Sequence, residues 1–165
     1  MYDVTLLIER QLSDLDAEQV VALHEGLDGD TVVYHLLLPV DTSASMLASS
    51  MSALGGGQIM TIADADMIAD VQNELSSAGQ AELDASAALL TARGQQVTVT
   101  LTEDDPISAL CDLVAETSSS EAIILTEPHI VREFLHVDWT SRAKRKLDVP
   151  TLHLLEHVPF SAQAH

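Results

Sequence analysis

Basic residues are scarce in this sequence. Only 7 of its 165 residues are Lys or Arg, against 26 Asp and Glu, which gives a formal net charge of -19. Nucleic acids and anionic membranes are bound by clustered cations, so this balance argues against both as partners. An acidic surface that repels its own copies is instead typical of a soluble protein.

Cysteine and long apolar stretches are also lacking. Cys111 is the only cysteine, so no internal disulfide can form. It shares helical spacing with Ile107, Leu110 and Val114, which favours a core thiol over a nucleophile. No apolar run approaches the roughly twenty residues that span a bilayer, and residues 1–4 lack the basic start of a signal peptide. We therefore expect a cytoplasmic protein.

The chain is long enough for one domain. With 165 residues, of which 47% are hydrophobic, it can bury one sizeable core, and it is too short for two large ones. We expect a single domain over residues 1–158, followed by a tail over residues 159–165.

Apolar runs alternate with helical patterns along the chain. Strands are predicted over residues 4–8, 31–38, 95–102, 121–125 and 149–155. Helices are predicted over about 13–27, 59–93 and 107–116, and within 132–146. The alternation predicts an α/β fold, an open five-stranded parallel sheet with helices on both faces. The 95–102 strand alternates valine or leucine with threonine, which places it at a sheet edge.

Three local signals refine this outline. Asp105 and Pro106 predict an N-cap followed by proline in the first helical turn. Gly79 lies on the apolar stripe of the long helix and predicts a kink or a close packing point. The segment 41–58 contains Gly55–Gly57, but no lysine and Ser/Thr follow these glycines, so a crossing loop is favoured over a phosphate cradle.

The order of these segments resembles the universal stress protein family. The resemblance rests on Asp105-Pro-Ile-Ser-Ala-Leu, the strand Ile123-Ile-Leu125, the polar loop and helix after it, and Val149-Pro-Thr-Leu-His-Leu154. It runs from Val4 to about Glu156. It implies the adenine nucleotide alpha hydrolase-like strand order 3-2-1-4-5 and a homodimer through the last strand. The residues expected at that interface are Val149, Thr151, Leu152, His153 and Leu154.

The resemblance fails at the family's phosphate-binding motif. Nucleotide-binding members carry Gly-x2-Gly-x9-Gly-Ser/Thr after the fourth strand, where bare backbone amides approach the phosphates. At that spacing this chain has Thr126, His129, Trp139 and Thr140, so that only the last position matches. Gly94 is the last glycine of the chain, and no later residue has the backbone freedom of such a loop. The resemblance therefore predicts that ATP is not bound in the family's usual mode.

Other residues near the motif affect whether a nucleotide or another small ligand can bind there. Asp138 is predicted to cap the fourth helix and to accept the amide hydrogens that a phosphate needs. Glu9 stands where ATP-binding members have an aspartate that contacts the nucleotide. A small ligand, ATP or AMP, held in another way is the alternative hypothesis. The residues that would line its crevice are Glu9, Val40, Thr126, His129, Arg132, Trp139 and Thr140.

Five of the seven basic residues fall within residues 132–146. Most belong to the second half of the predicted helix, where cations complement the negative end of the helix dipole, and this favours a structural role. Arg132 is the exception: it is a candidate for an anion contact or for pairing with Glu133 or Asp138.

A metal site is the third hypothesis. His129, Glu133 and His136 have i, i+4, i+7 spacing, which on one helix would present three metal ligands and support a metal-dependent enzyme. The first hypothesis is what the resemblance implies, a non-enzymatic stress-response or regulatory protein to which no cofactor is assigned.

Overall fold

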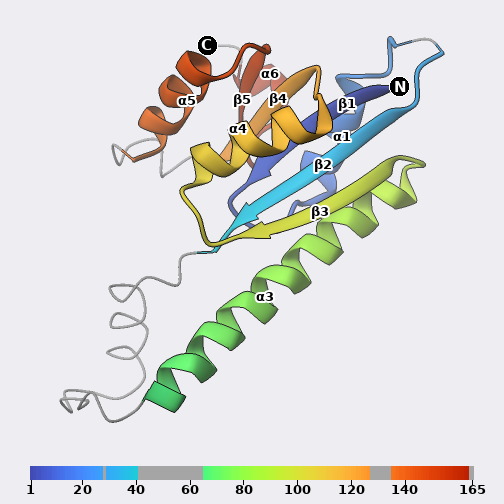
Figure 1. Ribbon diagram of the computed structural model, residues 1–165. Helices are drawn as coiled ribbons and strands as arrows, with labels where there is room; N and C mark the ends of the chain where they lie inside the picture. Colours follow the sequence, from blue (N-terminus) through green and yellow to red (C-terminus); the bar gives the residue numbers. More distant parts are fainter. Residues whose placement is uncertain (28, 41–64, 127–134, 164–165) are drawn as a thin grey trace.

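A five-stranded parallel β-sheet forms the middle layer of the chain (Figure 1). The computed structural model describes residues 1–27, 29–40, 65–126 and 135–163, without the side chains at 65–68, 135–140 and 160. The elements in chain order are β1 (Tyr2–Ile8), α1 (Asp14–Ala22), β2 (Val32–Pro39), α3 (Ala65–Ala92), β3 (Gln96–Thr102), α4 (Pro106–Thr117), β4 (Glu121–Thr126), α5 (Leu135–Lys146), β5 (Thr151–Leu155) and α6 (Phe160–Gln163).

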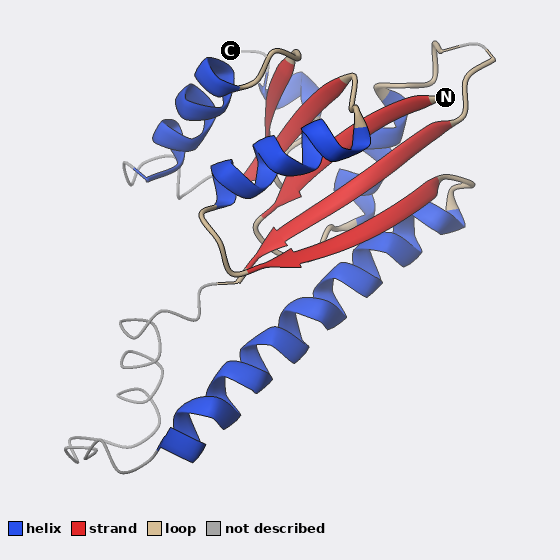
Figure 2. Cartoon of the chain, viewed as in Figure 1, coloured by secondary structure: helices blue, strands red, loops and turns tan. Residues whose placement is uncertain are grey.

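The strand order confirms the predicted α/β fold. The strands lie in the order β3-β2-β1-β4-β5, and each neighbouring pair is parallel. β3 and β5 form the two edges (Figure 2), and the alternating pattern of residues 95–102 had predicted the edge position of β3. β1 lies in the middle, where residues 4–8 are buried because helices cover both faces of the sheet.

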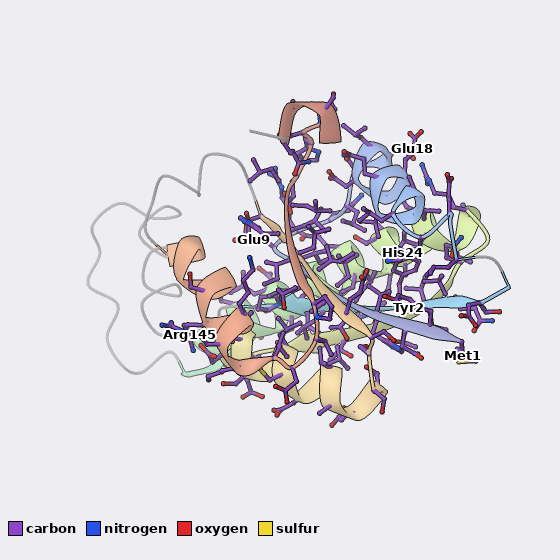
Figure 3. All side chains as sticks on the ribbon, turned by 90° about the horizontal axis from the view of Figure 1, so that it is seen from above. Met1, Tyr2, Glu9, Glu18, His24 and Arg145 are labelled. Atoms are coloured by element: carbon purple, nitrogen blue, oxygen red, sulfur yellow. The ribbon has the colours of Figure 1, made fainter. Side chains whose placement is uncertain are left out.

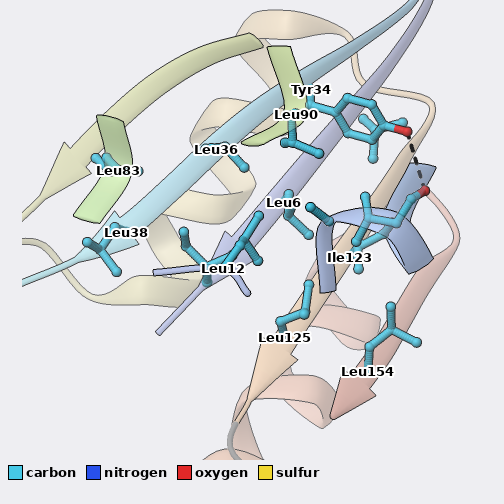
Figure 4. Packing of buried hydrophobic residues seen from close by; sticks show 14 of the residues in the cluster. Leu6, Leu12, Tyr34, Leu36, Leu38, Leu83, Leu90, Ile123, Leu125 and Leu154 are labelled. Atoms are coloured by element: carbon cyan, nitrogen blue, oxygen red, sulfur yellow. Dashed lines mark hydrogen bonds between the residues drawn. The ribbon is translucent and has the colours of Figure 1, made fainter. Parts of the chain in front are cut away.

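Two apolar clusters fill the space between the sheet and its helices. The first lies under α1 and α3 (Figure 4), and its largest fully buried side chains include Leu6, Leu12, Tyr34, Leu36, Leu38, Leu83 and Leu90. The second lies under α4 and α5 and includes Leu7, Leu37, Ile107, Leu110, Ile124 and Ala143. Each face of the sheet therefore has its own core, as two-sided burial of a parallel sheet requires.

Helix α1 begins where the sequence predicts and ends earlier. Ser13 and Asp16 form a reciprocal capping box, with each side chain accepting the other's backbone N–H at 3.1 Å. The helix ends at Ala22, so the predicted end near Leu27 is wrong. The backbone N–H of His24 donates to the carbonyl three residues earlier, which tightens the chain into turns after the last helical residue.

Helix α4 has both predicted boundaries. The Asp105 carboxylate accepts the Ser108 N–H at 3.0 Å, and Pro106 is the first helical residue. The helix ends at Thr117, where Ser118 adopts a left-handed conformation with φ of 51°.

Two predicted boundaries nearer the C-terminus are wrong. Helix α5 begins at Leu135, so Asp138 lies inside the helix and is not its N-cap. An acidic residue in a first helical turn complements the dipole without capping it, which explains the misleading signal. β5 begins at Thr151, after Pro150, and Val149 packs against the second core cluster instead of joining the strand.

Gly79 is a close packing point, one of its two predicted roles. A Cβ atom at this position would lie 2.7 Å from Cγ2 of Val40 and 3.0 Å from Cδ1 of Leu101. The absent side chain lets α3 approach the ends of β2 and β3. Although α3 has 28 residues, neither it nor any other helix in the described ranges is long and apolar enough to cross a membrane.

We expect Gly79→Val to lower the free energy of unfolding by about 2 kcal/mol, because overpacking a closed contact forces neighbouring side chains to shift. Urea denaturation followed by circular dichroism measures this change. The matched control is Gly26→Val, since a Cβ at Gly26 meets nothing within 4 Å. That change should stay within about 0.5 kcal/mol. Equal effects at both glycines would contradict the packing role of Gly79.

Candidate functional site

The carboxyl ends of the strands meet at one edge of the sheet. β1 and β4 are neighbours, and Ile8 lies opposite Leu125 in their register. After β1 the chain continues into α1 on one face, and after β4 it leads to α5 on the other face. Open α/β sheets bind ligands at such a point, where the connections after two neighbouring strands go to opposite faces of the sheet. This point is therefore the candidate site.

Three of the predicted crevice residues fall at this edge. Glu9 follows β1 directly, Thr126 ends β4, and Val40 follows β2. The backbone N–H of Val40 donates to the Thr102 carbonyl at 2.7 Å, which ties Val40 toward β3. The structure thus places Glu9 and Thr126 at the ends of neighbouring strands and Val40 farther toward the β3 edge.

Thr126 closes the end of β4. Its side chain is 0% exposed, and its hydroxyl lies 2.7 Å from Nε2 of His153 on β5. Its carbonyl accepts the backbone N–H of Glu156 at 2.8 Å. The position at which the resemblance leads us to expect the first glycine of a phosphate loop thus carries a buried, hydrogen-bonded side chain.

Glu156, which the sequence analysis did not single out, lies beside Thr126. Its side chain is 1% exposed, and Oε2 accepts from Nε of Arg10 at 2.7 Å. The other carboxylate oxygen, Oε1, is buried without a hydrogen-bond partner. Burial raises the pKa of Glu156 from its ordinary value of 4.5 to about 7, although Arg10 acts to lower it.

Asp16 adds a second buried carboxylate to this edge. Beyond its role in the α1 capping box, Oδ1 accepts the backbone N–H of His157 at 2.7 Å, and Oδ2 lies 3.3 Å from the His157 ring nitrogen Nδ1. These bonds hold His157 in a left-handed conformation with φ of 57°, which is uncommon for a residue with a Cβ. The turn after β5 is thereby fastened to the start of α1.

The charges at this edge do not favour a phosphate. The described groups around Glu156 are Glu9, Arg10, Asp16 and His157, and both neighbouring acids act to raise its pKa. Arg10 already bonds the Glu156 carboxylate. A phosphate placed here would face several carboxylates in a partly dry environment, where like charges repel strongly.

The other predicted ligand contacts are not described. His129 and Arg132 lie outside the described residues, and Trp139 and Thr140 belong to α5 but their side chains are not described. The same holds for the predicted metal ligands: His129 and Glu133 lie outside the described residues, and the side chain of His136 on α5 is not described. Among the side chains that the structure does describe, no group of three metal-binding residues occurs.

The described basic residues within 132–146 lie toward the C-terminal end of α5, where the sequence analysis expected them. Lys144, Arg145 and Lys146 form the last turn of α5. Arg142 bonds Asp105, the N-cap of α4, at 3.0 Å. The Ser108 backbone N–H and the Arg142 guanidinium lower the pKa of Asp105.

Cys111 packs against the second core cluster but is only half-buried. Burial raises the pKa of its thiol, which opposes the reactive thiolate form.

The amino end of the sheet contains a polar network that the sequence analysis missed. His24 contacts the Tyr34 hydroxyl at 2.8 Å through Nδ1, and its Nε2 contacts Glu121, which also accepts from Tyr2. Figure 3 shows Tyr2 and His24 toward one end of the sheet and Glu9 toward the other. We interpret the network as a structural link between β1, β2 and β4, since its polar groups bond one another.

A second histidine is held on the opposite face of the sheet. His35 on β2 lies 3.0 Å from the Asp3 carboxylate on β1 through Nε2, and 2.7 Å from the Thr98 hydroxyl on β3 through Nδ1. The order acid, histidine, hydroxyl is that of a nucleophile relay. Thr98 lies directly opposite His35 in the register, and Asp3 lies diagonally to it on the same face of β1. We therefore interpret these contacts as cross-strand hydrogen bonds.

The predicted interface residues lie on or beside β5. Leu152 is 40% exposed, Thr151 and His153 are half-buried, and Leu154 is 4% exposed in the first core cluster. Leu152 thus exposes an apolar side chain on an edge strand, whose outer backbone groups have no neighbouring strand within the described ranges.

Solved structures share this fold. The hypothetical protein MJ0577 has a TM-score of 0.64 at 13% identity, over 96% of this chain and 99% of that one. A universal stress protein family protein from Arabidopsis thaliana with AMP bound has a TM-score of 0.58 at 10% identity, over 99% of each chain. A universal stress protein family protein from Burkholderia pseudomallei has 0.55 at 14%, over 93% and 96%.

The sequence itself matches no protein-family model and no curated protein. By its sheet the chain is a parallel α/β protein. More narrowly, its fold is that of the universal stress proteins, as the resemblance predicted.

Glu156→Gln tests the buried carboxylate. Between about pH 4.5 and pH 7 the folded wild type keeps a proton that the unfolded chain has lost, so its stability falls as the pH rises. The variant lacks this loss. Across that window the free energy of unfolding of the variant should rise relative to that of wild type by up to about 3 kcal/mol, at about 1.4 kcal/mol per pKa unit. Above the window the difference should stay constant. Urea unfolding at several pH values measures the difference.

Arg10→Gln is the companion variant for this experiment. It removes the cation that lowers the pKa of Glu156, so the pH window of falling stability should extend upward. A difference between Glu156→Gln and wild type that does not change with pH would contradict the assignment.

Proposed function

We propose that this protein is a non-enzymatic stress-response or regulatory protein of the universal stress protein type, and that it does not bind ATP in that family's usual mode. The observation that carries the proposal is Thr126, a fully buried, hydrogen-bonded threonine at the point where a phosphate loop would begin. A loop that offers bare amides to phosphate needs residues without a Cβ at such positions.

The surroundings of Thr126 support the same proposal. Glu156 lies beside it as a buried carboxylate, and Asp16 is a second one nearby. The single described guanidinium known to reach this cluster, that of Arg10, bonds Glu156. A ligand with several negative charges would have to displace that ion pair and would leave a carboxylate buried without its cation.

We further propose that the protein is a homodimer that pairs through β5. The strand lies at a sheet edge, and Leu152 exposes an apolar side chain there. Pairing two edge strands across a two-fold axis would satisfy backbone groups and cover this leucine.

A nucleotide or another small ligand held by different contacts is the second candidate function. It is favoured by the AMP bound to the Arabidopsis thaliana protein of the same fold. In this chain Glu9 and Val40 would take part from the described edge, together with the sequence-predicted residues His129 and Arg132.

Nucleotide titration separates these two functions. We expect native mass spectrometry of the purified protein to detect no co-purified nucleotide. Calorimetric titration with Mg·ATP, and separately with AMP, should give no binding in the sub-millimolar range, because the described site holds carboxylates and no bare glycine amides. Sub-millimolar binding of either nucleotide would overturn the first function and support the second.

Leu152→Asp tests the proposed dimer. A carboxylate at this exposed edge position would face its own copy across the two-fold axis, so light scattering should detect a shift from dimer to monomer. The matched control is Leu23→Asp, because Leu23 is 39% exposed but lies at the end of α1. A monomeric wild type at high concentration, or equal effects of both changes, would contradict the β5 interface.

A further inference from the structure

The outward-facing backbone groups of β5 can be assigned from its bonds to β4. The Pro150 carbonyl accepts the Ala122 N–H at 2.9 Å, and the Glu156 N–H donates to Thr126 at 2.8 Å. Residues 150 and 156 therefore point toward β4, and the backbone groups of a parallel strand alternate in direction. The residues of β5 whose backbone N–H and C=O groups point away from β4, toward the open edge of the sheet, are Thr151, His153 and Leu155.

The last of these three residues is already bonded within the chain. The side-chain amide of Gln163, at the end of α6, accepts the Leu155 N–H at 2.9 Å through Oε1. Its Nε2 donates to the Leu155 carbonyl at 3.3 Å. A primary amide offers one carbonyl and two N–H groups, so Gln163 repeats the donor and acceptor of a neighbouring strand.

The segment that carries Gln163 is fastened in place. Nε2 of Gln163 also donates to the Val158 carbonyl, which accepts a second bond from Gln19 on α1 at 3.2 Å. One residue earlier, His157 is bonded to Asp16 through its backbone N–H. The contact between Gln163 and Leu155 is therefore part of a connected set of bonds between α1, β5 and α6.

We propose that Gln163 is an edge cap that competes with a second copy of this chain for the carboxyl end of β5. While it is in place, Leu155 cannot join a pairing between two β5 strands. Its release adds Leu155 to that pairing and lengthens the ladder. The inference rests on the proposed β5 dimer, and it names an intramolecular contact that limits how tightly this dimer forms.

The test compares dimer dissociation constants of full-length wild type and Gln163→Ala by sedimentation equilibrium. We expect the variant to associate roughly tenfold more tightly, the effect of about one additional set of backbone hydrogen bonds. Gln163→Glu keeps the acceptor for the Leu155 N–H but loses both donors, so its constant should lie between the two. The control is Gln80→Ala, whose side chain bonds Asp84 on the exposed face of α3.

The outcomes separate the cap from the dimer. Equal dissociation constants for wild type and Gln163→Ala would overturn the cap and leave the dimer standing. A monomeric wild type that dimerises after Gln163→Ala would support the cap and overturn the wild-type dimer. Monomers in both would overturn both proposals. Hydrogen exchange of the Leu155 amide in the diluted monomer is the second readout: it should be faster in Gln163→Ala, and an unchanged rate would overturn the cap.

Discussion

The bonds around the end of β4 are the constraint on which the rest of this edge depends. Thr126 bonds His153 through its hydroxyl and Glu156 through its carbonyl. β5 therefore pairs with β4 as far as Thr126, the last residue of β4. That alignment brings the Glu156 carboxylate under the loop after β1, where Arg10 meets it. The candidate site, the proposed dimer strand and the C-terminal turn therefore share one set of hydrogen bonds.

Buried acids make this arrangement costly for an anion. Glu156 is disfavoured in its charged form even with Arg10 beside it, and cations are scarce, since only 7 residues of the chain are Lys or Arg. A phosphate would add charge to the place where burial already penalises it. The same chemistry accommodates a neutral or hydrogen-bond-donating group more readily than a phosphate.

The sequence predicted most of the elements, but not the long-range contacts at the carboxyl edge of the sheet. Strong local signals, the capping box at Ser13 and the Asp105-Pro106 pair, located two helix starts because capping depends on neighbouring residues. Asp138 was misplaced because an acid inside a first turn looks like an N-cap. The Arg10–Glu156 bond joins residues 146 positions apart, and no periodicity or motif in one sequence records such a contact.

The central claim is that the carboxyl edge of the sheet is closed to phosphate. Amide chemical shifts in a ¹H–¹⁵N NMR titration with Mg·ATP test it most directly, because they report on Thr126, Glu156 and Arg10 individually. The account predicts that these three signals stay in place as nucleotide is added. Saturable shifts of the Thr126 and Glu156 amides in the sub-millimolar range would contradict it.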